Sequence, residues 1–160
     1  MNAQPNLGMQ PTTFDNPMGI DGFEFVEFAA PADQVHHLHN YFRKLGFVQV
    51  ARHKTRPIST YRQGDCTFLI NEDPDSFAAR FAAQHGPSAC GFAIRVKKLA
   101  EWARVQALEN GAESFDAADE LTKAVAAPVI KGIGDCMRYI VDRYDDKGTI
   151  HDPDDEYLPG

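Results

Sequence analysis

The sequence has few cysteines, no long apolar run and no signal peptide, and each absence excludes a class of protein. Its 160 residues include only three cysteines, Cys66, Cys90 and Cys136, which stand far apart. This odd number forms neither a disulfide framework nor a CxxC metal or redox pair, so we interpret the cysteines as small core residues. A reducing, cytoplasmic location fits this pattern best. No apolar stretch is long enough to cross a bilayer, and the amino terminus lacks the basic and apolar regions of an export signal.

Basic residues are also scarce, with 16 Lys and Arg against 23 Asp and Glu and a net charge of −7. Without a basic run to neutralise phosphates, nucleic acid and anionic membranes are poor partners. Apolar residues make up 43% of the chain and include 11 Phe, which is enough for a sizeable core. The length allows one domain or two small fused repeats.

The first half of the chain predicts a strand, a helix and three further strands. Residues 23–28 alternate between aromatic or aliphatic and acidic side chains at period two, which is typical of a half-buried strand. Val35, Leu38, Phe42 and Leu45 recur at helical spacing, and Pro31 suits the first helical position, so we expect a helix over about 31–45. Three strand-like runs follow, over residues 47–52, 59–62 and 66–71.

The same order of elements returns in the second half, after a short connecting helix. Asp73 as N-cap and Pro74 at N1 predict that connector over about 74–86. A strand over 91–96 and a helix over 99–110 precede strand-like runs at 113–115, about 124–130 and 137–142. We therefore expect an α+β fold of two βαβββ modules, over about 22–72 and 90–142, which form a mixed-sheet half-barrel with helices outside. Residues 1–13 are predicted to be a disordered tail, and 143–160 an acidic linker.

Three histidines on the first helix are candidate metal ligands, because imidazole is the commonest transition-metal ligand. They are His36, His37 and His39, of which only His36 and His39 share a helical face. Metal pairs on helices need i, i+4 spacing, or i, i+3 with a further ligand. The spacing therefore favours a solvated helix face over a metal site.

Glu27 is the other candidate, because the alternation places it among apolar neighbours. Phe23, Phe25 and Ala29 are expected on its face of the strand, and Glu24 on the opposite face. A buried carboxylate can act as an acid, a base or a ligand. A glutamate that pairs with an arginine at a sheet edge is the more frequent arrangement, and we favour it here.

Two further segments resemble binding sites only in composition. Residues 131–135 are glycine-rich and contain Lys131, but they match neither GxGxxG nor GxxxxGK[ST], so a hairpin turn is the better interpretation. The carboxylates of residues 145–156 lack the spacing of an EF-hand loop. No Cys, His or Ser lies in a nucleophile signature.

Five segments of the chain closely resemble bacterial 4-hydroxyphenylpyruvate dioxygenases. They occur in the family's order: residues 16–29 (NPMGIDGFEFVEFA), 61–64 (YRQG), 70–72 (INE), 81–88 (FAAQHGPS) and 130–134 (IKGIG). The resemblance covers nearly the whole chain but corresponds only to the amino-terminal half of the family. It implies a vicinal-oxygen-chelate fold, similar to that of glyoxalases, which agrees with the two modules predicted above.

The resemblance also implies non-haem Fe(II) chemistry in the parent protein. The family decarboxylates 4-hydroxyphenylpyruvate oxidatively with O₂ and hydroxylates its ring to give homogentisate and CO₂, in tyrosine and phenylalanine catabolism. Its iron ligands, two histidines and a carboxylate, lie in the carboxy-terminal half. None of the six histidines here matches them, so no catalytic, cofactor-binding or metal residue is expected in this chain, which we predict to be inactive alone.

The family further implies a homo-oligomer, in addition to the cytoplasmic location and the absence of nucleic-acid and membrane partners expected from the composition. The chain is expected to be a fragment of the dioxygenase; a naturally short relative that binds a ligand or serves as a scaffold is the alternative. The parent's product could also be the mandelate made by the related hydroxymandelate synthases. A metal-dependent glyoxalase or an antibiotic-sequestering relative ranks last, because residues 91–96 contain neither His nor Glu.

Overall fold

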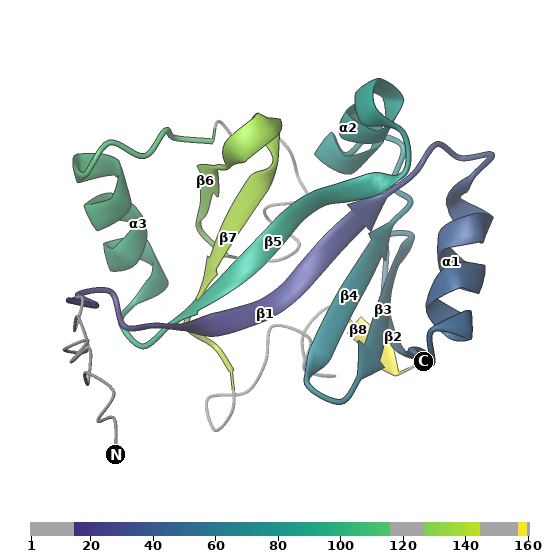
Figure 1. The fold of residues 1–160 in the computed structure, drawn as a ribbon, viewed down its shortest axis with the longest axis horizontal. Helices are drawn as coiled ribbons and strands as arrows, with labels where there is room; N and C mark the ends of the chain where they lie inside the picture. The colour runs from purple at the N-terminus through teal and green to yellow at the C-terminus, as the bar shows by residue number, and fades with distance from the viewer. Residues whose placement is uncertain (1–14, 116–126, 145–156, 160) are drawn as a thin grey trace, which may run out of the picture.

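The computed structural model describes residues 15–115, 127–144 and 157–159 of the chain. They form an open mixed sheet of eight strands, in the order β6-β7-β5-β1-β4-β3-β2-β8, with three α-helices (Figure 1). The first half contains β1 (Ile20–Ala29), α1 (Val35–Lys44), β2 (Val48–His53), β3 (Ile58–Gln63) and β4 (Cys66–Asn71). The second part contains α2 (Phe77–His85), β5 (Ser88–Val96), α3 (Ala100–Glu109), β6 (Val129–Lys131), the 3₁₀ turn η1 (Ile133–Asp135), β7 (Met137–Val141) and β8 (Tyr157–Pro159).

The pairing of the strands repeats about the centre of the sheet. The long strands β1 and β5 run antiparallel side by side in the middle. Each has a parallel partner on its other side, β4 for β1 and β7 for β5. Antiparallel neighbours then extend the sheet outward, through β3 and β2 on one side and β6 on the other. The predicted α+β half-barrel, with a mixed sheet that does not close, is confirmed.

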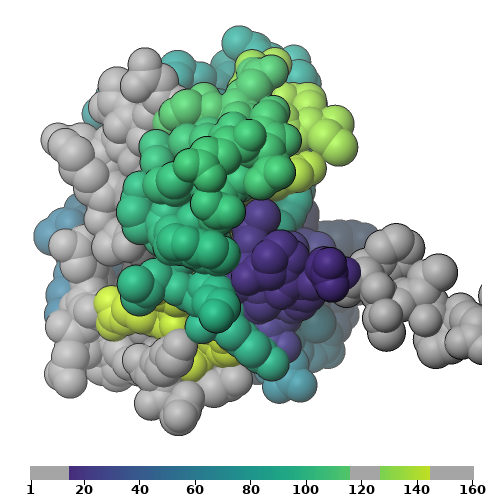
Figure 2. Space-filling model, turned by 90° about the vertical axis from the view of Figure 1, so that its left-hand side faces the viewer, coloured from purple at the N-terminus to yellow at the C-terminus, as the bar shows by residue number. Residues whose placement is uncertain are grey.

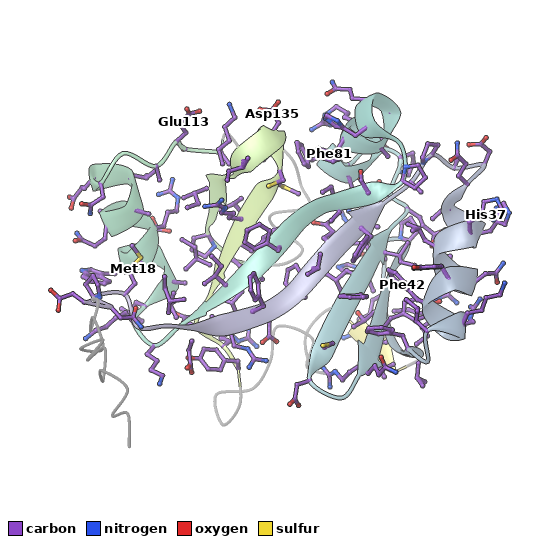
Figure 3. The ribbon with its side chains drawn as sticks, in the orientation of Figure 1. Met18, His37, Phe42, Phe81, Glu113 and Asp135 are labelled. Carbon is purple, nitrogen blue, oxygen red and sulfur yellow. The ribbon has the colours of Figure 1, made fainter. Side chains whose placement is uncertain are left out.

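The outer face of the sheet carries α1 and α3, one over each half. Phe42 of α1 packs on Tyr61 and Ile70 of the sheet, and Figure 3 shows it on the sheet side of the helix while His37 points away. Ala100 and Ala103 of α3 pack on Val96, Ile130 and Ile140. Figure 2 shows α3 beside the start of β1, where Met18 joins the same cluster.

The inner face, opposite α1 and α3, is filled with apolar side chains. Phe25, Leu69, Met137, Tyr139 and Val141 are each at most 2% exposed there. They form one cluster with apolar neighbours from β2, β3, β5 and β6. Helix α2 covers the end of the sheet near Ala29, against which Ala78, Phe81 and Ala82 pack.

A bulge in β1 breaks the alternation expected for this strand. Phe23 pairs with Ile94 and Val26 with Phe92, so three steps along β1 match two along β5. Phe23 therefore packs on Phe92 at the outer face, whereas Phe25 packs on Tyr139 at the inner face. The expectation that Phe23 and Phe25 share a face, with Glu24 opposite, was wrong. Glu24 instead binds Arg95, whose partner in β7, Val141, belongs to the cluster of the inner face.

Two helix starts also differ from the prediction. Pro31 lies in a turn before α1, and its carbonyl oxygen accepts hydrogen bonds from the amides of Gln34 and Val35. Helix α1 begins only at Val35. Ser76, rather than Asp73, caps α2, because its Oγ accepts the Ala79 amide at 3.1 Å. In both cases a local turn takes up the residues that sequence preference assigned to the helix.

Several predicted segments fall partly outside the described residues. The run at 113–115 contains an isolated bridge between Ser114 and Ile130. The run at about 124–130 is described from residue 127 on and forms β6 from Val129. The predicted tail at 1–13 and residues 145–156 of the predicted linker lie outside the described residues. Residues 157–159, at the far end of that linker, form β8 on β2. The predicted module boundaries remain predictions.

Candidate functional site

Glu27 lies in the centre of the sheet and is only 2% exposed. Asn71 at the end of β4 donates a hydrogen bond from Nδ2 to Glu27 Oε1 at 2.7 Å. The hydroxyl of Tyr139 in β7 donates to Glu27 Oε2 at 2.8 Å. The carboxylate thus joins β4 of the first half to β7 of the second, because its two oxygens accept donors from opposite sides.

The neighbours of Glu27 leave room for the carboxylate and little else. A Cβ at Gly91, its partner in β5, would lie 3.3 Å from Glu27 Oε2 and from the Met137 carbonyl oxygen. A glycine in this strand therefore allows the close approach of the glutamate. The Cys90 thiol donates to the Glu27 carbonyl at 3.6 Å, and burial, reinforced by the Glu27 charge, raises the pKa of that thiol well above its usual value.

Glu27 is therefore a buried structural junction, and the expected position at a sheet edge was wrong. The arginine pairing expected of it is found at Glu24, whose Oε2 accepts Arg95 Nε at 2.6 Å. Glu24 is 4% exposed, and the Arg95 guanidinium lies over the Tyr144 ring. Neither Asn71 nor Tyr139 was predicted as a partner of Glu27. Each of them is a polar residue beside an apolar run in its strand, and this pattern was the available signal for a buried polar contact.

The three histidines of α1 divide into two exposed rings and one that is held. The rings of His36 and His37 lie 3.9 Å apart and are exposed, as a solvated helix face predicts. His39 is different, because its Nδ1 lies 2.7 Å from the Tyr61 hydroxyl and its Nε2 lies 3.0 Å from Glu72 Oε2. It thus links α1 to β3 and to the end of β4, and its side chain is 16% exposed.

No metal centre is formed by the described residues. Within residues 15–115 and 127–144, no group of three or more His, Cys, Asp or Glu side chains is placed to hold an ion. Both oxygens of Glu27 and both ring nitrogens of His39 already face internal partners.

The glycine-rich segment forms the predicted hairpin turn between β6 and β7. The amide of Gly132 donates to the Cys136 carbonyl at 2.7 Å, and Gly134 and Asp135 have φ values of 64° and 62°. Lys131 lies between Glu113 and Asp135, at 3.2 Å and 3.5 Å. The hydrogen bond and charge of Glu113, with a further contribution from Asp135, raise the pKa of this lysine. Lys131 therefore forms ion pairs with two carboxylates, which compete with any phosphate for its charge.

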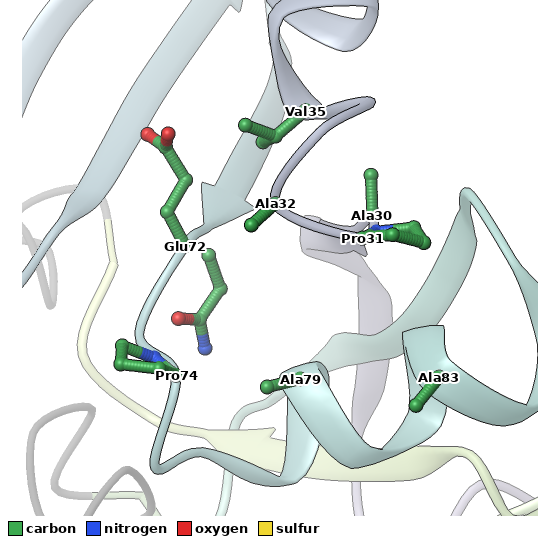
Figure 4. A pocket seen from close by; sticks show the side chains of 9 residues that line it. Ala30, Pro31, Ala32, Val35, Glu72, Pro74, Ala79 and Ala83 are labelled. Carbon is green, nitrogen blue, oxygen red and sulfur yellow. The ribbon is translucent and has the colours of Figure 1, made fainter.

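A cavity of about 380 Å³ lies between the start of α1, the end of β4 and α2 (Figure 4). Small apolar residues form most of its wall, among them Ala30, Pro31, Ala79 and Ala83. The Glu72 side chain also contributes, but it points away from α2, toward its bond with His39. None of the described residues that line this cavity therefore provides a free ionic group for a charged ligand.

Comparison with known proteins settles the family. Residues 14–156 match the family model described as hydroxyphenylpyruvate dioxygenase, HPPD, N-terminal. The chain belongs to this family. It is 40% identical over 147 residues to a 4-hydroxyphenylpyruvate dioxygenase of Pseudomonas sp. (strain P.J. 874). The aligned region covers 92% of this chain and 40% of that protein.

Two other similar proteins agree with this family. Hemolysin VllY of Vibrio vulnificus is 44% identical over 140 residues, which cover 87% of this chain and 38% of that protein. A solved fusion of a xylose isomerase-like TIM barrel with a 4-hydroxyphenylpyruvate dioxygenase matches with a TM-score of 0.75 and 26% identity, over 95% of this chain and 24% of the fusion. The HPPD-family chain thus spans about 40% of the length of its two sequence relatives, and corresponds to the amino-terminal part.

No helix among the described residues of this HPPD-family chain has the length and apolar character needed to span a membrane.

Proposed function

We propose that this chain is the non-catalytic amino-terminal domain of a dioxygenase that converts 4-hydroxyphenylpyruvate and O₂ to homogentisate and CO₂ in tyrosine and phenylalanine catabolism. The observation that carries the proposal is the family match over residues 14–156, together with 40% identity to a protein named for this activity. The parent protein would use non-haem Fe(II), which activates O₂ in such enzymes when bound by two histidines and a carboxylate.

The described residues do not fit an iron site of this kind. Such a site needs two histidines and a carboxylate on one side of the metal, with open positions for substrate and oxygen. The buried carboxylate of Glu27 has Asn71 and Tyr139 on its oxygens, and no histidine lies in that cluster. The proposal therefore assigns iron and substrate to residues beyond those described here.

The packing of the inner face supports a scaffold role for the domain. Phe25, Tyr139 and Met137 occupy the concave side of the sheet, and the cavities beside α1 and α2 are not lined by them. A filled concave side stabilises the half-barrel, whereas a substrate site needs an opening of several hundred Å³. Assembly into a homo-oligomer and a cytoplasmic location remain predictions.

Oxygen uptake measured on two proteins tests the proposal. The first is the product of the whole natural reading frame that contains this sequence, and the second is the 160-residue chain alone. With Fe(II) and 4-hydroxyphenylpyruvate, we expect the first to consume O₂ and to form homogentisate, identified by chromatography, and the second to do neither.

The results separate the alternatives. Iron-dependent turnover by the 160-residue chain would refute the non-catalytic assignment. Formation of 4-hydroxymandelate by the whole product would move the parent to the related synthases. A natural reading frame that ends at residue 160 would favour a separate binding or scaffold module.

A further inference from the structure

A polar cavity of about 380 Å³ lies on the outer face of the sheet, beside α1. It is separate from the apolar cavity in Figure 4, although Glu72 borders both. Helix α1 contributes His39 and Arg43 to it, and β2 contributes Gln49 and Arg52. Its volume falls in the range of small-molecule sites.

Among the described residues that line this cavity, positive charges outnumber negative charges. Among the described residues, Arg43 and Arg52 form no ion pair with a carboxylate. Of the described residues that line the cavity, Glu72 is the sole carboxylate, and its Oε2 lies 3.0 Å from His39 Nε2. Two arginines therefore line a space in which the one described carboxylate is bound to His39.

The charged groups of the cavity also affect the pKa of Tyr61, whose hydroxyl contacts His39. Burial raises the pKa of Tyr61, while Arg43 lowers it, Glu72 raises it and Arg52 lowers it. Tyr61 is fully buried, so both guanidinium groups act on one fixed point of the sheet. The two arginines are placed together by their shared lining of the cavity.

His39 can change its charge at this place without movement of its ring. When the Tyr61 hydroxyl donates to Gln49 Oε1, at 3.3 Å, the oxygen of Tyr61 accepts from His39 Nδ1, at 2.7 Å. Since Nε2 donates to Glu72, the ring then carries both protons and is an imidazolium. When the hydroxyl turns and donates to Nδ1, the ring is neutral. A rotation of one hydroxyl separates the two states.

We propose that this cavity binds a small dianionic oxyanion, of the phosphomonoester or dicarboxylate class, between Arg43 and Arg52, and that its binding favours the protonated state of His39. Guanidinium groups bind both kinds of anion through paired N–H donors. Both arginines are exposed, so the ligand has a direct path from solvent. This site is independent of the iron chemistry assigned above to the parent protein.

Titration of the purified 160-residue chain with inorganic phosphate and with malonate, followed by calorimetry and by amide NMR shifts, tests the site. Sodium chloride at matched ionic strength measures simple screening. We expect saturable binding with shifts centred on α1 and β2. Arg43→Gln and Arg52→Gln should each weaken binding roughly 10-fold or more, because each removes charge-assisted hydrogen bonds.

Arg62→Gln is the matched control, since Arg62 is an exposed arginine of β3 that does not line the cavity. It should change the affinity by less than about twofold, as a charge beyond the contact distance is screened. Equal losses in all three variants, or equal shifts with chloride, would overturn the proposal. Preference for phosphate or for malonate identifies the ligand class. Thermal melts of each variant show whether a loss of binding is a loss of folding.

A pH series with sulfate, which stays a dianion throughout, tests the link to His39. Affinity should fall as the pH rises, because the site loses one positive charge when His39 gives up its proton. Five ionisable groups face or line the cavity, namely Tyr61, Glu72, Arg43, Arg52 and His36, apart from His39 itself. His36→Gln should keep the fall in affinity, and His39→Gln should abolish it.

The ring resonances of His39 in the unaltered chain give a second readout that needs no variant. Saturating sulfate should move the titration midpoint of His39 to higher pH, because bound anion favours the imidazolium. An unchanged midpoint, or an affinity that depends on pH equally in His39→Gln, would show that the proton and the anion are not coupled.

Discussion

Helices α1 and α3 occupy equivalent places in the two halves, but they are attached to the sheet by different means. Phe42 of α1 lies at the centre of an aromatic cluster, with ring centroids 5.1 Å from Phe28 and from Phe68, 5.6 Å from Tyr61 and 5.9 Å from Phe47. The buried residues of helix α3 are two alanines, Ala100 and Ala103. One large side chain anchors the first helix, whereas small side chains let the second pack closely.

The polar contacts differ in the same way. His39 links the middle of α1 to Tyr61 and Glu72. The side chain of Gln34, the N-cap residue of α1, forms no capping hydrogen bond. The start of α3 is bound from β7, because Asp142 Oδ2 accepts the Ala100 amide at 2.9 Å. One topology is therefore stabilised through a helix face in one half and through a helix end in the other.

Truncation of the aromatic anchor should give the largest effect. We expect Phe42→Ala to lower the free energy of unfolding by about 3–5 kcal/mol, because it removes a buried ring and leaves a cavity. Ala103→Gly, at a fully buried position of α3, should cost only about 1 kcal/mol through helix propensity. Urea unfolding monitored by far-ultraviolet circular dichroism measures both.

Tyr41→Ala is the control for α1, since Tyr41 is 59% exposed and should matter by less than about 0.5 kcal/mol. If Phe42→Ala cost no more than Ala103→Gly, the first helix would not depend on a single anchor.

The junction at Glu27 should show the next largest effect, and it concerns both halves together. Tyr139→Phe removes the hydrogen bond from β7 to Glu27 Oε2 but keeps the ring against Phe25. We expect a loss of about 1–3 kcal/mol, since a buried carboxylate loses a donor. Amide hydrogen exchange should show faster opening of β4 as well as β7, because both bind the same carboxylate. Faster exchange confined to β7 would mean that Glu27 does not couple the halves.

The element types could be predicted from local pattern, because alternation and helical spacing reflect burial of one face. The period-two run of β1 and the helical spacing of Phe42 both led to the right element. The bulge that moves Phe23 to the outer face could not be predicted, since it depends on the pairing of β1 with β5, about 70 residues away.

The partners of the buried polar groups were missed for the same reason. Tyr139 is 112 residues from Glu27, and Glu72 is 33 residues from His39. Spacing within one helix or one strand carries no information about such contacts. His39 was accordingly grouped with His36 and His37, although it alone reaches the sheet.

The smallest predicted effect concerns the end of α3. Asp142→Ala removes the acceptor of the Ala100 amide, and we expect a loss of about 0.5–2 kcal/mol, as for other helix caps. Asp142→Asn should cost less than Asp142→Ala, because the asparagine amide oxygen can still accept the Ala100 hydrogen bond. It should still cost some stability, because the negative charge that favours a helix amino terminus is lost. Exchange of the amides in the first turn of α3 should rise in the same order, with α1 unchanged. If α1 opened equally, the two helices would belong to one cooperative unit, and the difference in their attachment would have no energetic meaning.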